Sequence, residues 1–92
     1  MAKVLDFKAV WCGPCRTYGP IFEKVSKNPE FKDITFESID VDENEDMSAK
    51  YSIRNIPTTV LVNDSDIEVG RRLGYMTEED LVNFIKEALC ES

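Results

Sequence analysis

Two cysteines separated by Gly-Pro constrain this chain most, because they stand where one local pattern ends and another begins. Trp11-Cys12-Gly13-Pro14-Cys15 follows an apolar, β-prone run at residues 3–7 and precedes an apolar stripe with helical spacing. A strand-to-helix junction places the first sulfur near a helix N-terminus, where backbone N–H groups and the helix dipole stabilise a thiolate. Two further residues bring the second sulfur within disulfide reach. The motif predicts a reactive thiol with a resolving partner.

Other uses of the cysteines fit the sequence less well. A zinc site needs about four ligands, whereas the chain has three cysteines and no histidine, which also excludes catalysis by histidine. A structural cross-link between Cys12 and Cys15 would close a loop of only two residues. Cys90 lies about 180° around the last predicted helix from Leu81. We expect it to be an incidental terminal cysteine, and the alternative is a site of glutathionylation or intermolecular disulfide formation.

Charge and length narrow the class of protein further. The 92 residues predict one domain over 1–92, and the net charge of -7 opposes binding to nucleic acid or to an anionic membrane. Asp6 interrupts any N-terminal apolar segment, and no run approaches the roughly 20 apolar residues of a membrane span. We therefore expect a cytoplasmic protein in a reducing compartment.

Residues 37–46 hold six acids and no base, but they lack the spacing of a calcium loop. This segment therefore predicts a solvated acidic face that steers a basic partner.

The hydrophobic patterns predict seven elements in the order β-α-β-α-β-β-α. They are a strand at residues 3–7, a helix after the cysteine motif that ends at Asn28-Pro29, a strand at 34–41, a helix at 44–51, a hairpin of 58–62 and 67–73, and a last helix capped by Thr77. This order indicates an α/β fold with a four-stranded mixed sheet. Two parallel strands joined by a right-handed crossover precede an antiparallel hairpin, and helices cover both faces.

Residues 4–16 resemble the active-site strand and loop of thioredoxins, and the Trp-Cys-Gly-Pro-Cys match is very specific. Three further features are similar in the same order: Pro20, the segment at residues 51–58 with its Ile-Pro-Thr, and Gly74 after the last strand. The resemblance covers essentially the whole chain. It implies a thioredoxin-like fold that lacks the family's extra N-terminal strand and helix.

The resemblance also implies roles for individual residues. Cys12 would attack a target disulfide, and Cys15 would resolve the mixed disulfide that results. A carboxylate inside an apolar strand has a raised pKa, so Asp6 would accept the proton of Cys15; the alternative is a side chain hydrogen-bonded to a neighbouring turn. The Ile56–Pro57 bond would be cis. The substrate groove would include Trp11, Gly13, Pro14, Ile56, Pro57 and Gly74, with Tyr75 at its border, and a substrate strand would pair with backbone groups beside Pro57.

Two positions depart from the family pattern. Lys8 stands where thioredoxins usually have a second tryptophan, and Ser38 stands where many have a lysine beside the buried aspartate. A cation at position 8 would favour the Cys12 thiolate and attract acidic targets, or it would simply extend over the surface. The missing partner at position 38 would change how Asp6 titrates, so the redox potential does not follow from the family.

The main functional expectation is a monomeric thiol-disulfide oxidoreductase that reduces protein disulfides through a reversible Cys12–Cys15 disulfide. It would need no bound cofactor and would take electrons from a thioredoxin-reductase-like flavoprotein or from small thiols such as glutathione. Two alternatives stay open. One is a glutaredoxin-like reductase, although glutaredoxins more often carry Cys-Pro-Tyr-Cys. The other is a partner-binding module with idle cysteines. A disulfide oxidase or isomerase would normally occupy a different compartment.

Overall fold

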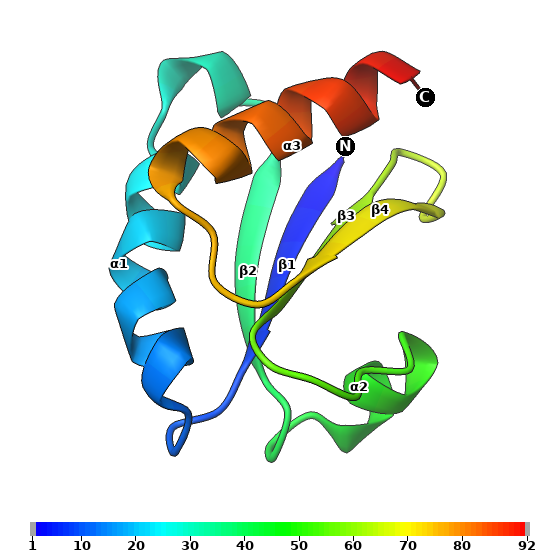
Figure 1. The fold of residues 1–92 in the computed structure, drawn as a ribbon. Coiled ribbons are helices and arrows are strands. Elements are labelled where there is room, and N and C mark those ends of the chain that lie inside the picture. Colours follow the sequence, from blue (N-terminus) through cyan, green and yellow to red (C-terminus); the bar gives the residue numbers. More distant parts are fainter. Residues whose placement is uncertain (1, 92) are drawn as a thin grey trace.

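A computed structural model describes residues 2–91 and shows the predicted order of elements with one addition (Figure 1). The addition is a 3-10 turn, η1, between the first helix and the second strand. The elements are β1 (Lys3–Lys8), α1 (Gly13–Ser26), η1 (Pro29–Phe31), β2 (Thr35–Asp40), α2 (Glu45–Lys50), β3 (Thr58–Val62), β4 (Glu68–Leu73) and α3 (Glu78–Glu91).

The four strands form one mixed sheet in the order β2-β1-β3-β4. β1 runs parallel to β2 and antiparallel to β3, and β3 pairs with β4 as an antiparallel hairpin. The prediction of a mixed four-stranded sheet is confirmed. β1 and β3 are the central strands and their residues are almost all buried, whereas most residues of the edge strands β2 and β4 are exposed or half-exposed.

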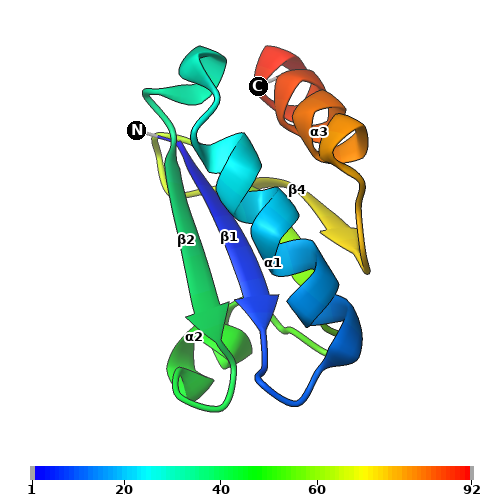
Figure 2. The same ribbon diagram turned by 90° about the vertical axis from the view of Figure 1, so that its left-hand side faces the viewer.

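Helices pack on both faces of this sheet, as predicted. α1 and α3 lie next to each other on one face, where they bury a cluster that includes Val4 and Leu61 from the strands (Figures 1 and 2). The opposite face buries Leu5, Phe7 and Val60 against Tyr51, which directly follows α2. The alternation of faces along β1 therefore divides the core into two layers.

Local sequence explains where the helices begin and end. Asn28 accepts a hydrogen bond from the Glu30 backbone N–H at 2.9 Å, which starts η1 and turns the buried Phe31 into the core. The turn was not predicted because Asn28-Pro29 marks the end of a helix but carries no signal for the conformation of the next residues. Thr77 accepts a hydrogen bond from the Asp80 N–H at 3.1 Å and caps α3 as expected.

The sheet also places four side chains in one row across all four strands. Asp6 is paired with Ser38 on β2 and with Thr59 on β3, and Thr59 is in turn paired with Arg72 on β4. The row lies under the α1 layer, since Tyr18 of α1 contacts Thr59. Among the described residues, no helix has the length and apolar character that crossing a bilayer requires.

Candidate active site

Cys12 and Cys15 form a disulfide at the junction between β1 and α1. Their Cα atoms are 5.3 Å apart, within the normal range for this bond. Both side chains are buried, with 5% and 4% of their surface exposed, while Gly13 and Pro14 between them are exposed. The exposed part of the motif is therefore its Gly-Pro bridge.

The first sulfur caps the helix. Cys12 is the N-cap residue of α1, and its Sγ accepts a hydrogen bond from the Cys15 N–H at 3.2 Å. Pro14 occupies the first turn, where its missing N–H leaves no partner unsatisfied. A reduced Cys12 at this position has a backbone donor and the positive end of the helix dipole to stabilise its thiolate.

Asp6 is an unpaired buried acid on β1, the strand that leads to the disulfide. Its side chain is 1% exposed, and neither carboxylate oxygen has a hydrogen-bond partner within residues 2–91. Burial raises the pKa of Asp6 from 3.8 to about 6, and the positive charge of Lys8 opposes part of that rise. The expected rise is confirmed, and the alternative of a carboxylate bonded to a neighbouring turn is wrong.

A buried, hydrogen-bonded pair of hydroxyl groups lies beside Asp6. The Tyr18 hydroxyl of α1 and Thr59 Oγ1 of β3 are hydrogen-bonded at 2.7 Å. Burial raises the pKa of Tyr18, the Thr59 hydrogen bond lowers it, and the nearby Asp6 adds a smaller rise. This phenol stays neutral at physiological pH, so Asp6 is the group that titrates in this layer.

The loop before β3 brings a third segment to the disulfide. The Ile56–Pro57 peptide bond is cis, as expected, and the Ile56 carbonyl oxygen lies 3.9 Å from Cys12 Sγ. Gly74 donates its N–H to the Pro57 carbonyl at 2.7 Å and adopts a φ of 87°, a conformation that glycine tolerates best. Cys12, Ile56, Pro57 and Gly74 are thus brought together from three parts of the chain.

Large apolar side chains surround this meeting point. Trp11 is 65% exposed, and Leu73 and Tyr75 flank Gly74 with 62% and 47% exposed. Trp11 is held in place on the surface, because its Nε1–H donates to Asp42 Oδ2 at 2.8 Å. The sequence shows Asp42 only as one member of an acidic segment, so its bond to Trp11, 31 residues away, was not predicted.

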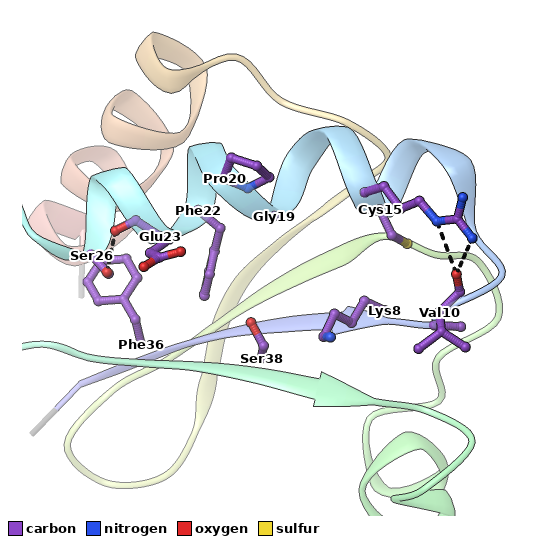
Figure 3. Close-up of a pocket in the computed structure, with 12 residues that line it drawn as sticks. Lys8, Val10, Cys15, Gly19, Pro20, Phe22, Glu23, Ser26, Phe36 and Ser38 are labelled. Carbon is purple, nitrogen blue, oxygen red and sulfur yellow. Dashed lines mark hydrogen bonds between the residues drawn. The ribbon is translucent and has the colours of Figure 1, made fainter.

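Arg16 is the second residue that the sequence does not single out. Its Nε and Nη2 both donate to the Val10 carbonyl, at 3.2 and 3.0 Å (Figure 3). This clamp ties the first turn of α1 to the loop that carries Trp11. A single arginine after the motif carries no signal for such a bond, since the loop's path decides which carbonyl it reaches.

A groove of about 750 Å³ opens beside the disulfide, between α1 and the strands β1 and β2 (Figure 3). Its lining includes Cys15, Arg16, Lys8 and Ser38, and Phe36 closes its apolar end. The two positions that depart from the family pattern, Lys8 and Ser38, therefore face the same groove as the second sulfur.

The acidic segment forms a separate hollow lined by residues 42–47. Its carboxylates enter none of the salt bridges found within residues 2–91, and no group of three or more His, Cys, Asp or Glu side chains there is placed to hold a metal ion. Cys90 is in α3, but its side chain lies outside the described part of the structure, so the expectation for it stays a prediction.

Comparisons with known proteins agree with this geometry. A family model described as thioredoxin matches residues 1–87. A thioredoxin of Mycoplasmoides gallisepticum is 41% identical over 83 residues, which cover 90% of this chain and 80% of that protein. The Fasciola hepatica thioredoxin structure is 40% identical with a TM-score of 0.84, over 95% of this chain and 80% of its own. A malarial protein structure, 29% identical, has a TM-score of 0.85 and covers 97% and 98%. The chain belongs to the thioredoxin family and is a dithiol-disulfide exchange oxidoreductase.

Proposed function

We propose that the protein reduces disulfides of client proteins, with Cys12 as nucleophile and Cys15 as resolving thiol. The observation that carries this proposal is the position of Cys12 Sγ, which caps α1 and accepts the Cys15 N–H. The Cys12 thiolate attacks one sulfur of a client disulfide, a Cys12–client bond forms, and the other client sulfur leaves as a thiolate. Cys15 then attacks Cys12, which releases the second client thiolate and closes the Cys12–Cys15 disulfide. Two electrons pass from the dithiol to the client.

Asp6 is the proton acceptor for the second step in this proposal. Cys15 must lose its proton before it attacks, and it lies on α1, whose Tyr18 is hydrogen-bonded to Thr59, the strand neighbour of Asp6. An acid whose pKa is about 6 is ionised at neutral pH and still basic enough to take a thiol proton in the transition state. The proton then passes to water.

The client docks over the surface formed by Trp11, Gly13, Pro14, Ile56, Pro57 and Gly74. This surface combines exposed apolar side chains with backbone atoms next to Cys12. Apolar contact and pairing with an extended client segment fit a broad range of proteins. The protein acts as a monomer in a reducing compartment, needs no bound cofactor, and regains electrons from a reductase-like flavoprotein or from small thiols.

Replacing each cysteine by serine tests the roles, in a Cys90→Ser background. Cys12→Ser abolishes reduction of insulin, whereas Cys15→Ser abolishes turnover but accumulates a Cys12–insulin mixed disulfide detectable by mass spectrometry. A mixed disulfide on Cys15 instead of Cys12 would contradict the assignment. Partner-binding activity that survives both substitutions would favour the binding-module alternative.

The redox potential separates protein-disulfide reduction from the glutaredoxin-like alternative. Equilibration in glutathione buffers of graded potential measures it directly. The redox potential of thioredoxin is about -270 mV, and those of glutaredoxins lie between about -200 and -230 mV. A value near the first supports the proposal, and a value near or above the second contradicts it.

A further inference from the structure

The unpaired carboxylate of Asp6 has one nearby cation on its own strand. Asp6 and Lys8 are two residues apart on β1, so their side chains emerge on the same face of the sheet. Lys8 is half-buried and lines the groove together with Cys15 and Ser38. In Figure 3 its amino group points back along β1 toward Ser38, which is the residue paired with Asp6. The Cys15 sulfur points from α1 toward the sheet.

The two arginines on this side of the sheet make contacts of their own. The Arg16 guanidinium donates to the Val10 carbonyl, and the Arg72 guanidinium lies 4.7 Å from the centre of the Phe84 ring. Lys8 enters no salt bridge in the described part of the chain. Lys8 acts on Asp6 from the same strand, and Tyr18 of α1 is electrostatically coupled to it. Its strand neighbours on β2 and β3 are the hydroxyl residues Ser38 and Thr59, and Arg72 lies beyond Thr59 on β4. The other titratable or charged groups on this side, Cys15, Arg16 and Glu23 of α1, line the groove together with Lys8.

We propose that Lys8 is a positioning residue for the resolving step: its ammonium, held in the groove beside Cys15, stabilises the charged form of Asp6 so that this carboxylate can take the Cys15 proton. The groove is open, so Lys8 keeps its own hydration while its charge acts on a buried acid. The electrostatics agree with the placement, since the Lys8 charge lowers the Asp6 pKa that burial raises. This inference rests on the proposed role of Asp6.

Lys8 changes no bond in this step. The Cys15 S–H proton moves to Asp6, the Cys15 thiolate forms a bond to Cys12 Sγ, and the bond between Cys12 and the client breaks. The client leaves with the electron pair of that bond as a thiolate, and the proton on Asp6 passes to water. Without Lys8, Asp6 is protonated at a higher pH, so fewer molecules can start the step near pH 6.

The test compares Lys8→Met with Lys8→Arg, which keeps the charge, and with Lys3→Met, which removes an exposed lysine from the other end and the other face of β1. All carry Cys90→Ser. The Asp6 pKa is measured by carboxyl ¹³C NMR in the oxidised protein, where Cys12 and Cys15 do not titrate. The resolving rate is the decay of a Cys12–peptide mixed disulfide, followed by Trp11 fluorescence after rapid mixing at pH 6 and pH 8.5.

We expect Lys8→Met to move the Asp6 titration upward by about one pH unit, which slows resolution about fivefold at pH 6 and leaves it unchanged at pH 8.5. Lys8→Arg and Lys3→Met should match the parent at both pH values. An unmoved Asp6 titration in Lys8→Met, or an equal loss at both pH values, would overturn the inference. Lys8→Gln gives the same comparison if Lys8→Met does not fold.

Asp6→Asn in the same assay keeps the two proposals apart. If Asp6→Asn resolves at the parent rate at pH 6, the proposed role of Asp6 is wrong and the Lys8 inference fails with it. If Asp6→Asn is slow but Lys8→Met leaves the Asp6 titration in place, only the Lys8 inference fails.

Discussion

At the scale of single residues, the fold disfavours the ionised form of the Asp6 side chain. Its carboxylate is 1% exposed and lacks a hydrogen-bond partner among the described residues, so its ionised form is poorly solvated. The folded protein therefore holds the Asp6 proton more tightly than the unfolded chain, with a pKa of about 6 against 3.8. The stability gained from protonated Asp6 is complete below about pH 4 and is lost as the pH rises through about 6.

Asp6→Asn should remove this pH dependence. Between pH 5 and pH 7.5 we expect the oxidised parent to lose about 1 to 1.5 kcal/mol of unfolding free energy more than Asp6→Asn, because only the parent must carry a buried charge at the higher pH. Urea unfolding at both pH values measures the difference. An equal change in unfolding free energy between the two pH values in both proteins would show that the Asp6 pKa is not raised in the folded state.

Residue-scale prediction from the sequence succeeded where a pattern is local. The Cys12–Cys15 spacing and the charge of Asp6 inside an apolar strand both show in a few neighbouring letters, and the structure has the disulfide and the raised pKa. The Trp11–Asp42 and Tyr18–Thr59 bonds join residues 31 and 41 positions apart. No local pattern specifies such pairs, because the packing of whole elements decides which side chains meet.

At the scale of elements, helix ends were predictable where a side chain caps them. Thr77 and Asp80 form the expected hydrogen bond at the start of α3, and Pro14 lies in the first turn of α1. α2 is shorter than expected, Glu45–Lys50 against residues 44–51. The side chain of its N-cap residue, Asn44, donates to the Asp40 carbonyl and makes no capping hydrogen bond. Such a short helix depends on tertiary packing, so its bounds are the least readable from sequence.

Thr77→Ala should cost the oxidised protein about 1 kcal/mol of unfolding free energy, because the Asp80 N–H loses its acceptor at the first turn of α3. Thr77→Ser is the matched control, since serine keeps the hydroxyl, and it should stay near the parent. Chemical unfolding at one pH measures both. A loss in Thr77→Ser as large as in Thr77→Ala would assign the effect to the methyl group instead of the cap.

At the scale of the whole molecule, charge is distributed unevenly around the disulfide. The chain carries a net charge of -7, and the acidic segment reaches the site through the Trp11–Asp42 bond. Lys8 and Arg16 line the groove next to Cys15, which is separate from the hollow of the acidic segment. Unpaired surface charges of one sign steer encounters with partners of the opposite sign over about a Debye length.

Client charge should therefore change the encounter rate more than the chemical step. With two disulfide peptides that differ only in lysine or glutamate flanks, we expect kcat/KM at about 20 mM salt to be several-fold higher for the lysine peptide. The difference in kcat/KM between the two peptides should disappear at about 0.5 M salt, where screening is nearly complete. A gap that persists at high salt would indicate direct contacts instead of long-range attraction.

The cap of α1 couples the redox state of Cys12 to the stability of the helix. Cys12 Sγ is both the atom that a client binds covalently and the acceptor that completes the first turn of the helix. A thiolate accepts a hydrogen bond more strongly than a sulfur shared in a disulfide. The cap bond is already present in the disulfide form, so reduction of Cys12 strengthens it, and the stability of the first turn of α1 follows the redox state of the cysteine pair.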